Sequence, residues 1–546
     1  MPPLHQEPRV PVTSRLARPA VVGTALLLLC TGLPLALAGQ GTGAAAAPGV
    51  RPPAVPESGL RYVLGGEAGR QTLDTTKDPL IQHDTATEPS LAVDPADPDH
   101  VVIGYQEGRD DAGGDITNGF STSFDGGKTW KVGVVPGLTS FDPVSPTSPY
   151  TRGSDAVVAF GPVDPRTHKS VVYFSSLVFD PTGLNTRSAI VDSTSHDGGL
   201  TWDLPTVVQD DDGGGLNDKN WLVVDTSSAP GHHLGRVYVV WDRVAGVIAK
   251  YSDDQGKTWV GPPSPAYLPN VYAAQGIGAI PLVLPSGALA VTFLADVAPV
   301  PVRLNPGDEL AEAAQGVSRV VTAVAPLAGQ TPSGLPLVFT PPTSVTAFGG
   351  AAVRHQRAGG LVSADVDPRT GRVFVTVEDA SGRPDGNNDV VLLSSDDVEA
   401  AQPTWTRTRV NGGPTGDQVD HYDPAVAVGK GTVRVMWRQR QETASADVTT
   451  YATRVSTWVA QSVDGGKSFA PALRVDRDVN DVRFAAFSRG GAFQGDYDQI
   501  ATATDGRSYV VHAEAVPQSA AEVPPAVPSA TTVHHQRMWV TSVRGR

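Results

Sequence analysis

The sequence of 546 residues contains one cysteine, Cys30, and three methionines. Cys30 lies in an apolar stretch near the N-terminus, so a chain cleaved after that stretch has no disulfide and no thiol chemistry. Leu29 precedes Cys30 where a lipoprotein signal needs a small residue, which argues against a lipid anchor. We therefore expect core packing, not cross-links, to stabilise the folded part.

Two further absences narrow the function. The net charge is −15, and no long basic run follows the N-terminal stretch. An acidic surface repels phosphate backbones, so nucleic acid is excluded as a partner. No amphipathic pattern of helical period is present, while 58 glycines and 47 prolines punctuate the chain. This composition favours an all-β fold over a helical one.

The N-terminus has the pattern of an export signal. Basic residues precede an apolar stretch at residues 21–37, and Ala36-Leu37-Ala38 supplies small residues at the cleavage positions. We interpret residues 1–38 as a signal peptide and the Gly/Ala/Pro-rich residues 39–58 as a linker. We therefore expect a secreted, extracellular protein. The alternative is a membrane anchor, which requires that the leader is not cleaved.

Beyond the linker, apolar residues alternate with period two, in pairs of short strands joined by Pro/Asp/Gly turns. Such pairs occur at residues 91–105, 155–179, 220–243, 279–295, 361–379, 424–438 and 498–514. Most are followed by two more strands, giving antiparallel units of four strands that repeat every 60–75 residues or so. The pattern predicts one β-propeller domain at residues 59–546, with seven blades and six as the alternative. A strand near Arg61–Leu64 would complete the last blade.

A short turn recurs between the third and fourth strands. It reads STSFDGGKTW at residues 121–130, and near copies carry the same aspartate; the four aspartates are Asp125, Asp197, Asp254 and Asp464. Glycine supplies positive φ, and a carboxylate can accept hydrogen bonds from turn amides. Because a catalytic acid does not occur at one place in successive repeats, we interpret these aspartates as structural. A fifth copy, with Asp396, Asp397 and Thr404, is interrupted by an insertion.

These turns resemble the Asp-box, or bacterial neuraminidase repeat, of sialidases and other β-propeller proteins. The resemblance covers most of residues 88–514. It implies a propeller and a sialidase-like glycoside hydrolase, with exo-α-sialidase as the most specific form. Fold alone does not determine function, so the site must be argued separately.

Unlike residues occupy the entry ends of the first strands, and these ends converge at one mouth of a propeller channel. The residues expected there to bind substrate are Glu88, Arg109, Asp155, Asp218, Lys219, His421, Asp423 and Asp496. A mouth so rich in carboxylates would be acidic, which favours a neutral or cationic ligand. The alternative is that polar residues lie there only because loops begin there.

The resemblance implies two catalytic residues. Residues 495–514 are similar to the sialidase segment with the nucleophilic tyrosine, which implies Tyr497. Residues 104–130 are similar to the segment with the acid/base, which implies Asp111, with Asp110 and Asp115 as alternatives. The family also binds substrate through three arginines, and the candidates by position are Arg152, Arg354, Arg357 and Arg438. Glu88-Pro89-Ser90 stands where the family has Arg-Ile-Pro.

Two function classes therefore remain. The first is a hydrolase of extracellular glycans; the second is a non-catalytic propeller that binds a glycan, a cell-wall polymer or a protein at its mouth. We expect a monomer without a cofactor. Asp210, Asp211 and Asp212 could bind Ca²⁺, but the favoured interpretation is a solvated acidic loop. Two His-His pairs lack a third ligand at usable spacing, so no zinc site is predicted.

Overall fold

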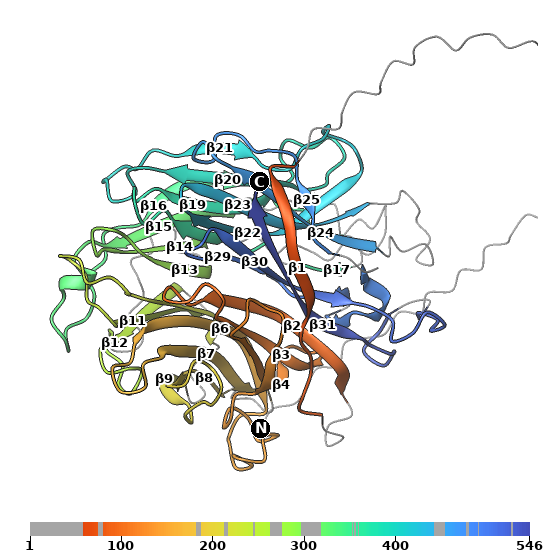
Figure 1. Cartoon of the computed structure of the whole chain (residues 1–546), viewed down its shortest axis with the longest axis horizontal. Helices are drawn as coiled ribbons and strands as arrows, with labels where there is room; N and C mark the ends of the chain where they lie inside the picture. The colour runs from red at the N-terminus through yellow and green to blue at the C-terminus, as the bar shows by residue number, and fades with distance from the viewer. Residues whose placement is uncertain are drawn as a thin grey trace, which may run out of the picture. The chain divides into compact units, whose positions relative to one another are not determined.

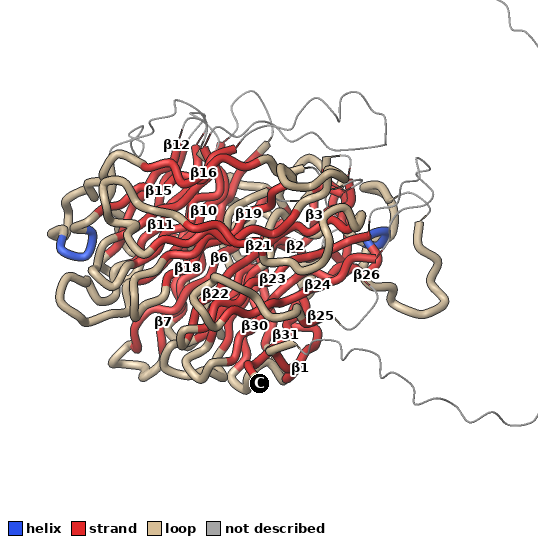
Figure 2. Tube along the Cα trace, turned by 90° about the horizontal axis from the view of Figure 1, so that it is seen from above, coloured by secondary structure: helices blue, strands red, loops and turns tan. Residues whose placement is uncertain are grey.

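The protein is described from a computed structural model. The described residues are 58–74, 80–181, 187–211, 217–243, 246–262, 276–295, 318–351, 353, 356–358, 360–441, 454–476, 480–489, 491–525 and 528–546. They are almost entirely β-strand and turn, with two short 3₁₀ turns, η1 (Ala328–Gln330) and η2 (Val482–Phe484), as Figure 2 shows. None of the helices in these ranges is long and apolar enough to span a membrane. The predicted all-β class is confirmed.

The strands form successive antiparallel meanders (Figure 1). The first two contain β2 (Ile81–Val93), β3 (Val101–Asp110), β4 (Asp115–Ser123) and β5 (Lys131–Val134), then β6 (Arg152–Val163), β7 (Ser170–Asp180), β8 (Arg187–Ser195) and β9 (Thr206–Asp211). A single bridge between Asp115 and Gly153 joins these two into one sheet. The next two contain β10 (Asn217–Val224), β11 (Val237–Arg243) and β12 (Gly246–Ser252), then β13 (Ile277–Val283), β14 (Leu289–Ala295), β15 (Ser318–Ala325) and β16 (Thr343–Phe348).

The remaining sheets follow the same order, apart from one small sheet. Two meanders contain β18 (Ser363–Val366), β19 (Val373–Asp379), β20 (Asp389–Ser395) and β21 (Thr406–Arg409), then β22 (Val419–Gly429), β23 (Thr432–Gln441), β24 (Arg454–Ser462), β25 (Leu473–Arg474) and β26 (Asn480–Asp481). The last contains β29 (Gln499–Thr502), β30 (Arg507–Ala515), β31 (Gln536–Gly545) and β1 (Leu60–Gly69). The small sheet pairs β17 (Gln356–Arg357) in parallel with β28 (Gly491–Phe493), which also pairs with β27 (Ala486–Ser488).

The N-terminal strand β1 pairs with β31, the C-terminal one (Figure 1). The pairing extends from Leu60 opposite Gly545 to Gly69 opposite Met538. The prediction that a strand near Arg61–Leu64 completes the last sheet is confirmed. The first strands of the meanders also pack in a closed circuit: β2 against β6, then β10, β13, β18, β22 and β29, which returns to β2.

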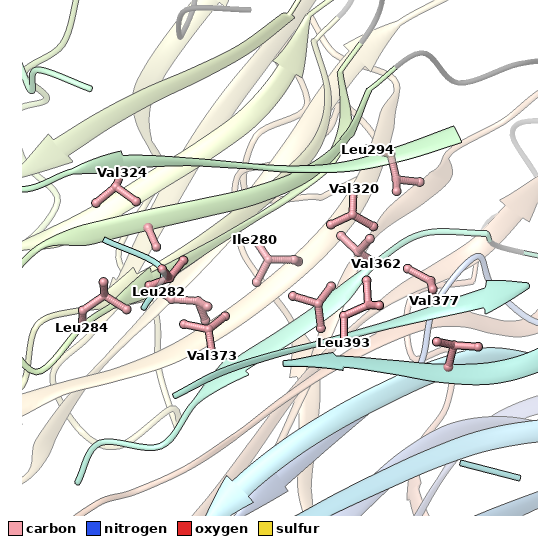
Figure 3. Packing of buried hydrophobic residues seen from close by; sticks show 14 of the residues in the cluster. Ile280, Leu282, Leu284, Leu294, Val320, Val324, Val362, Val373, Val377 and Leu393 are labelled. Atoms are coloured by element: carbon pink, nitrogen blue, oxygen red, sulfur yellow. The ribbon is translucent and has the colours of Figure 1, made fainter. Parts of the chain in front are cut away.

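The hydrophobic core lies between neighbouring meanders. Along β14, Ala290 and Leu294 face the meander of β18–β21, whereas Val291 and Phe293 on the other face pack toward β10–β12. Figure 3 shows one such layer, in which Leu294, Val320 and Val324 meet Val373, Val377 and Leu393. Alternation with period two therefore buries both faces of the middle strands. Each fully buried Val or Leu side chain stabilises the fold by about 1.5–3 kcal/mol.

The four repeated aspartates close their own turns. Asp197 Oδ1 accepts hydrogen bonds from Ser195 Oγ (2.9 Å) and from the amides of Leu200 (3.0 Å) and Thr201 (2.9 Å), and Oδ2 accepts from Thr201 Oγ1 (2.7 Å). Asp125, Asp254 and Asp464 make the corresponding bonds. These bonds support the structural interpretation of the four residues.

The interrupted fifth copy makes the same turn. Ser395 Oγ donates to Asp397 Oδ1 (2.9 Å), and Thr404 donates to the same carboxylate through its amide (2.8 Å) and its hydroxyl (3.0 Å). The insertion therefore lengthens the turn and leaves its hydrogen bonds in place. Asp396 instead pairs with Arg372.

Candidate functional site

A cavity of about 540 Å³ lies where the first strands begin. The charged residues that line it are Glu88, Arg109, Asp155, Asp218, Lys219, Arg357, Glu378, Arg489 and Asp496. They come from separate meanders and from the small sheet of β17, β27 and β28. Six of the eight residues that the sequence assigned to substrate binding are among them. The other two, His421 and Asp423, lie outside this lining.

The first strands share an irregularity that places these side chains. Glu88, Asp155, Lys219 and Asp423 have φ between 41° and 51°, the left-handed region that side chains other than glycine rarely adopt. Each lies at a shift in strand register, that is, at a β-bulge. A bulge redirects a side chain and costs strain of order 1–3 kcal/mol per left-handed residue. Three of the four residues, Glu88, Asp155 and Lys219, line the cavity, so the irregularity and the candidate site lie at the same level of the strands.

Glu88 is buried in a hydrogen-bonded setting. One carboxyl oxygen accepts from Gln106 Nε2, and the other accepts from the amide of Asp496 (3.1 Å). Burial and the nearby charges of Asp496 and Asp155 raise the pKa of Glu88 to about 8. This carboxyl group is therefore protonated at neutral pH.

Asp155 connects the cavity to Tyr497. The Tyr497 hydroxyl donates to Asp155 Oδ1 (3.4 Å), and the Lys219 amide donates to Oδ2 (3.1 Å). Burial raises the pKa of Asp155 to about 7 and raises the pKa of Tyr497 well above its usual range. Tyr497 does not line the cavity itself; it lines a second chamber of about 410 Å³.

Lys219 lines both chambers. Its Nζ lies 3.6 Å from the centroid of the Tyr497 ring and 4.4 Å from that of Trp221. Among the described residues, no hydrogen-bond acceptor reaches this buried atom. Burial lowers the pKa of Lys219, against the opposing effect of Asp155 and Glu88. Contact with aromatic faces partly replaces the lost hydration of the ammonium group.

The small sheet adds an arginine wall. Arg109 and Arg357 lie over the Phe493 ring, 4.3 and 4.4 Å from its centroid, and both donate to Ser488 Oγ. Arg357 forms an ion pair with Asp496, and Arg109 forms one with Asp115 (2.9 Å). The third cavity arginine, Arg489, is exposed.

These cations change the expected electrostatics. The sequence analysis predicted an acidic mouth, because most of the residues expected there carry carboxylates. Four basic residues also line this cavity: Arg109, Arg357, Arg489 and Lys219. In addition, burial holds Glu88 in its neutral form at neutral pH. The cavity is thus of mixed charge, and repulsion no longer excludes an anionic ligand.

The predicted acid/base lies outside the cavity lining. Asp111 is half-buried, and its Oδ1 accepts from the Arg489 amide (3.1 Å). Of its alternatives, Asp110 forms an ion pair with Arg152 (2.5 Å), and Asp115 forms one with Arg109. All three side chains thus contact arginine residues of the protein, and none of them lines the cavity.

Other predicted residues are placed elsewhere. His421 is buried, with Nδ1 3.1 Å from Asn388 O. Asp423 lines the second chamber, and the fully buried Arg438 pairs with Asp498. Arg354 lies outside the described residues. The three candidate arginines within the described ranges form separate ion pairs: Arg152 with Asp110, Arg357 with Asp496 and Arg438 with Asp498.

Of the three acidic loop residues for which Ca²⁺ was the less favoured interpretation, Asp212 lies outside the described residues. Asp210 forms an ion pair with Arg187 (2.6 Å), and Asp211 forms one with Arg243 (3.1 Å). Within the ranges that the structure describes, no three His, Cys, Asp or Glu side chains are grouped as a metal site.

Sequence reasoning missed Glu378, Arg489 and Ser488. Glu378 lies near the end of β19, the second strand of its meander, inside an apolar run. The sequence analysis searched for site residues only where the first strands begin, so it did not include this position. Arg489 and Ser488 lie in an insertion before the last meander, with no repeat counterpart. The pairing of β17 with β28 and the hydrogen bonds from Ser488 and Arg489 to Asp111 hold this insertion at the cavity.

No protein-family model matches this chain, and no curated protein matches it. Solved structures with some likeness include an α-L-arabinofuranosidase of Fusarium graminearum, at 14% identity over 68% of this chain and 92% of that chain, with a TM-score of 0.40. Another is the NanB sialidase of Streptococcus pneumoniae, at 12% identity over 67% of each chain and a TM-score of 0.38. A third is a polysaccharide lyase that acts on ulvan, at 12% identity over 88% and 95%, with a TM-score of 0.46. At such values the likeness carries no weight for function.

Proposed function

We propose that the seven meanders are the blades of a β-propeller and that the cavity at its mouth is the active site of a secreted glycoside hydrolase. The closed circuit of first strands supports the propeller. The Asp-box resemblance and the hydrogen bonds of the four turns support the same interpretation. The signal-peptide pattern supports secretion.

One observation carries the catalytic proposal. A single cavity contains carboxyl groups in two different settings: Glu88 is buried with its pKa raised to about 8, and Asp496 forms an ion pair with Arg357. Hydrolysis of a glycosidic bond needs a carboxylic acid that protonates the departing oxygen and a carboxylate on the other side.

The lining also suits a sugar ring. Carboxyl, guanidinium and amide groups offer hydrogen bonds to hydroxyls, while Leu177 and Phe179 provide apolar surface. The volume of about 540 Å³ falls within the usual range of ligand sites, roughly 300–1,000 Å³. We therefore expect a mono- or disaccharide unit of an extracellular glycan to occupy it.

The Tyr497 hydroxyl lies next to a carboxyl group of the cavity wall, that of Asp155. Its hydroxyl has a base within reach, Asp155, which supports the nucleophile that the sequence implied. However, the hydroxyl lies beside Asp155 and not in the cavity lining, and two of the three cavity arginines are used in internal ion pairs. We therefore propose glycoside hydrolysis in general, with sialosides as one substrate class to test.

The test is turnover of a panel of aryl glycosides, including sialosides, neutral sugars and uronosides, by the secreted full chain. We expect Asp496→Asn to lower kcat by about 10²-fold or more, because the cavity loses its ion-paired carboxylate. Asp505→Asn is the matched control: Asp505 also pairs with arginines, Arg507 (2.7 Å) and Arg544 (2.6 Å), but lies outside the cavity. Folded protein that turns over no member of the panel would sink the proposal.

A second candidate is glycan binding without turnover. It is favoured by Glu88, both of whose oxygens are already bonded to protein groups. Calorimetric titration with the glycans of the panel separates the two candidates. Binding with no product release supports the binder, and product release supports the hydrolase.

A further inference from the structure

Glu378 is a cavity carboxyl group to which neither the repeat pattern nor the resemblance assigns a role. It is 3% exposed and lines the cavity from β19, a second strand in its meander. In the circuit of first strands, its meander is separated from that of Glu88 by the meanders of β22 and β29. Glu378 therefore approaches the cavity from a different side.

The two oxygens of Glu378 are used unequally. Oε1 accepts from the amide of Asp423 (2.8 Å) and more weakly from that of Gly360 (3.4 Å). Among the described residues, none donates a hydrogen bond to Oε2. The backbone thus fixes one oxygen and leaves the other available to a ligand.

The other buried cavity acids differ in this respect. Both oxygens of Glu88 accept from protein groups, and so do both oxygens of Asp155. A proton on either residue would have to leave an existing hydrogen-bond arrangement. Glu378 needs no such rearrangement, because its free oxygen can hold the proton and face the ligand.

We propose that Glu378 is the general acid of the hydrolysis, donating its proton to the oxygen of the departing group. This inference rests on the proposed function. The proton moves from Oε2 to the glycosidic oxygen, the C–O bond breaks, and its electron pair stays with the departing oxygen. Water then adds to the anomeric carbon and releases one proton to the Asp496 carboxylate, and transfer between the two carboxyl groups restores the starting state.

The electrostatic surroundings agree with this role. Burial, together with the neighbouring charges of Asp420 and Asp496, raises the pKa of Glu378 to about 8, against the opposing effect of the two amide hydrogen bonds. The group therefore carries a proton at neutral pH. An acid whose pKa lies close to the working pH transfers that proton most effectively.

The experiment compares two departing groups on whichever sugar the wild type hydrolyses. A phenyl glycoside needs protonation of its oxygen, whereas a dinitrophenyl glycoside does not. We expect Glu378→Gln in the full chain to lower kcat by about 10²–10⁴-fold on the phenyl glycoside and less than about tenfold on the dinitrophenyl glycoside. A structural role would slow both substrates alike, and that result would overturn the inference.

Glu107→Gln is the matched control. Glu107 is a fully buried glutamate whose pKa is raised to about 7, but it accepts hydrogen bonds from Thr72 and Leu73 and does not line the cavity. We expect no dependence on the departing group in this variant. A dependence as large as that of Glu378→Gln would show that the effect is not specific to the cavity, and would also overturn the inference.

A second measurement needs no variant. In the wild type, kcat on the phenyl glycoside should fall as pH rises through about 8, the pKa of Glu378, while the dinitrophenyl glycoside shows no such fall. Identical profiles would overturn the role of Glu378 even if the variant fails to fold. Wild-type turnover with these negative results removes only the inference, whereas no turnover of any glycoside removes the proposed function as well.

Discussion

At the scale of single residues, one amino-acid type serves two purposes in this chain. The pKa of Asp125 is lowered to about 2, mainly because Thr129 and the turn amides donate to its carboxylate. The pKa of Asp155 is raised to about 7, mainly by burial. Hydrogen bonding thus keeps the turn aspartate charged, and desolvation favours the neutral form of the cavity aspartate. Aspartates of one chain thus differ in pKa by several units because their surroundings differ.

The structural acids are open to a direct test. We expect Asp197→Ala to lower the free energy of unfolding by about 1–3 kcal/mol, because the turn loses its hydrogen-bond acceptor. Denaturant unfolding measures the change, and kcat on any substrate found should stay within about twofold.

Asp203→Ala is the control for that variant. Asp203 belongs to the same turn region, but its side chain is 69% exposed and lies 3.5 Å from His196. We expect a change within about 0.5 kcal/mol. Equal effects of the two substitutions would contradict the structural role of Asp197.

At the scale of strands, the sequence predicts the pairs but not their irregularities. Alternating apolar residues and Gly/Pro turns identify the strands because period two and turn chemistry are local properties. The bulges at Glu88, Asp155, Lys219 and Asp423 have no local signal, since these residues disfavour positive φ and tertiary packing imposes it. Hence the level of the site was predictable, but the direction of its side chains was not.

The hairpin between β22 and β23 provides a stability test at this scale. Its two turn residues, Lys430 and Gly431, have φ of 50° and 77°, as a type I′ turn requires. Lys430 is exposed, and asparagine tolerates this conformation better than lysine does. We expect Lys430→Asn to raise the free energy of unfolding by about 0.5–1 kcal/mol.

Lys467→Asn controls for the loss of a surface charge. Lys467 is also an exposed turn residue, but it is absent from the residues with positive φ. Thermal unfolding should place this variant within about 0.5 kcal/mol of the wild type. A stabilisation equal to that of Lys430→Asn would point to charge and not to backbone conformation.

At the scale of the whole molecule, buried acids connect stability to pH. Besides Glu88 and Glu378, whose pKa values are about 8, Glu107 and Asp365 have pKa values raised to about 7. In the unfolded chain all of these groups ionise near pH 4–4.5. The folded chain therefore holds more protons at neutral pH, and its stability falls as pH rises toward 8.

We expect the melting temperature to fall by a few degrees between pH 6.5 and pH 8. The pKa of a turn aspartate such as Asp125 lies far below this pH window. Buried His512 has a pKa well below 6.5, so near pH 8 it is neutral in both the folded and the unfolded chain. Glu107→Gln should flatten the dependence, because glutamine resembles the protonated acid and does not titrate. A melting temperature that rises over the same window would contradict the raised pKa values.

The same scale explains what the sequence could not predict about the site. The beginnings of the first strands are equivalent positions in successive repeats. Their place within the repeat was therefore enough to identify Glu88, Asp155, Asp218 and Asp496. By contrast, Arg357, Ser488 and Arg489 are brought together by the parallel pairing of β17 with β28, two segments more than 130 residues apart. This pairing does not recur in the other meanders, so the repeat pattern could not predict it. Such long-range pairing is decided by the assembled fold.

The pairing of β1 with β31 has a consequence for biosynthesis. Leu60 meets Gly545, so a growing polypeptide cannot complete its last sheet until the ribosome has released nearly the entire chain. Until then, the pairing of β1 with β31 cannot stabilise the place where the first meander, with β2, meets the last one, with β29. This delay agrees with the secretion proposed above, because a chain that stays incomplete during synthesis stays competent for translocation.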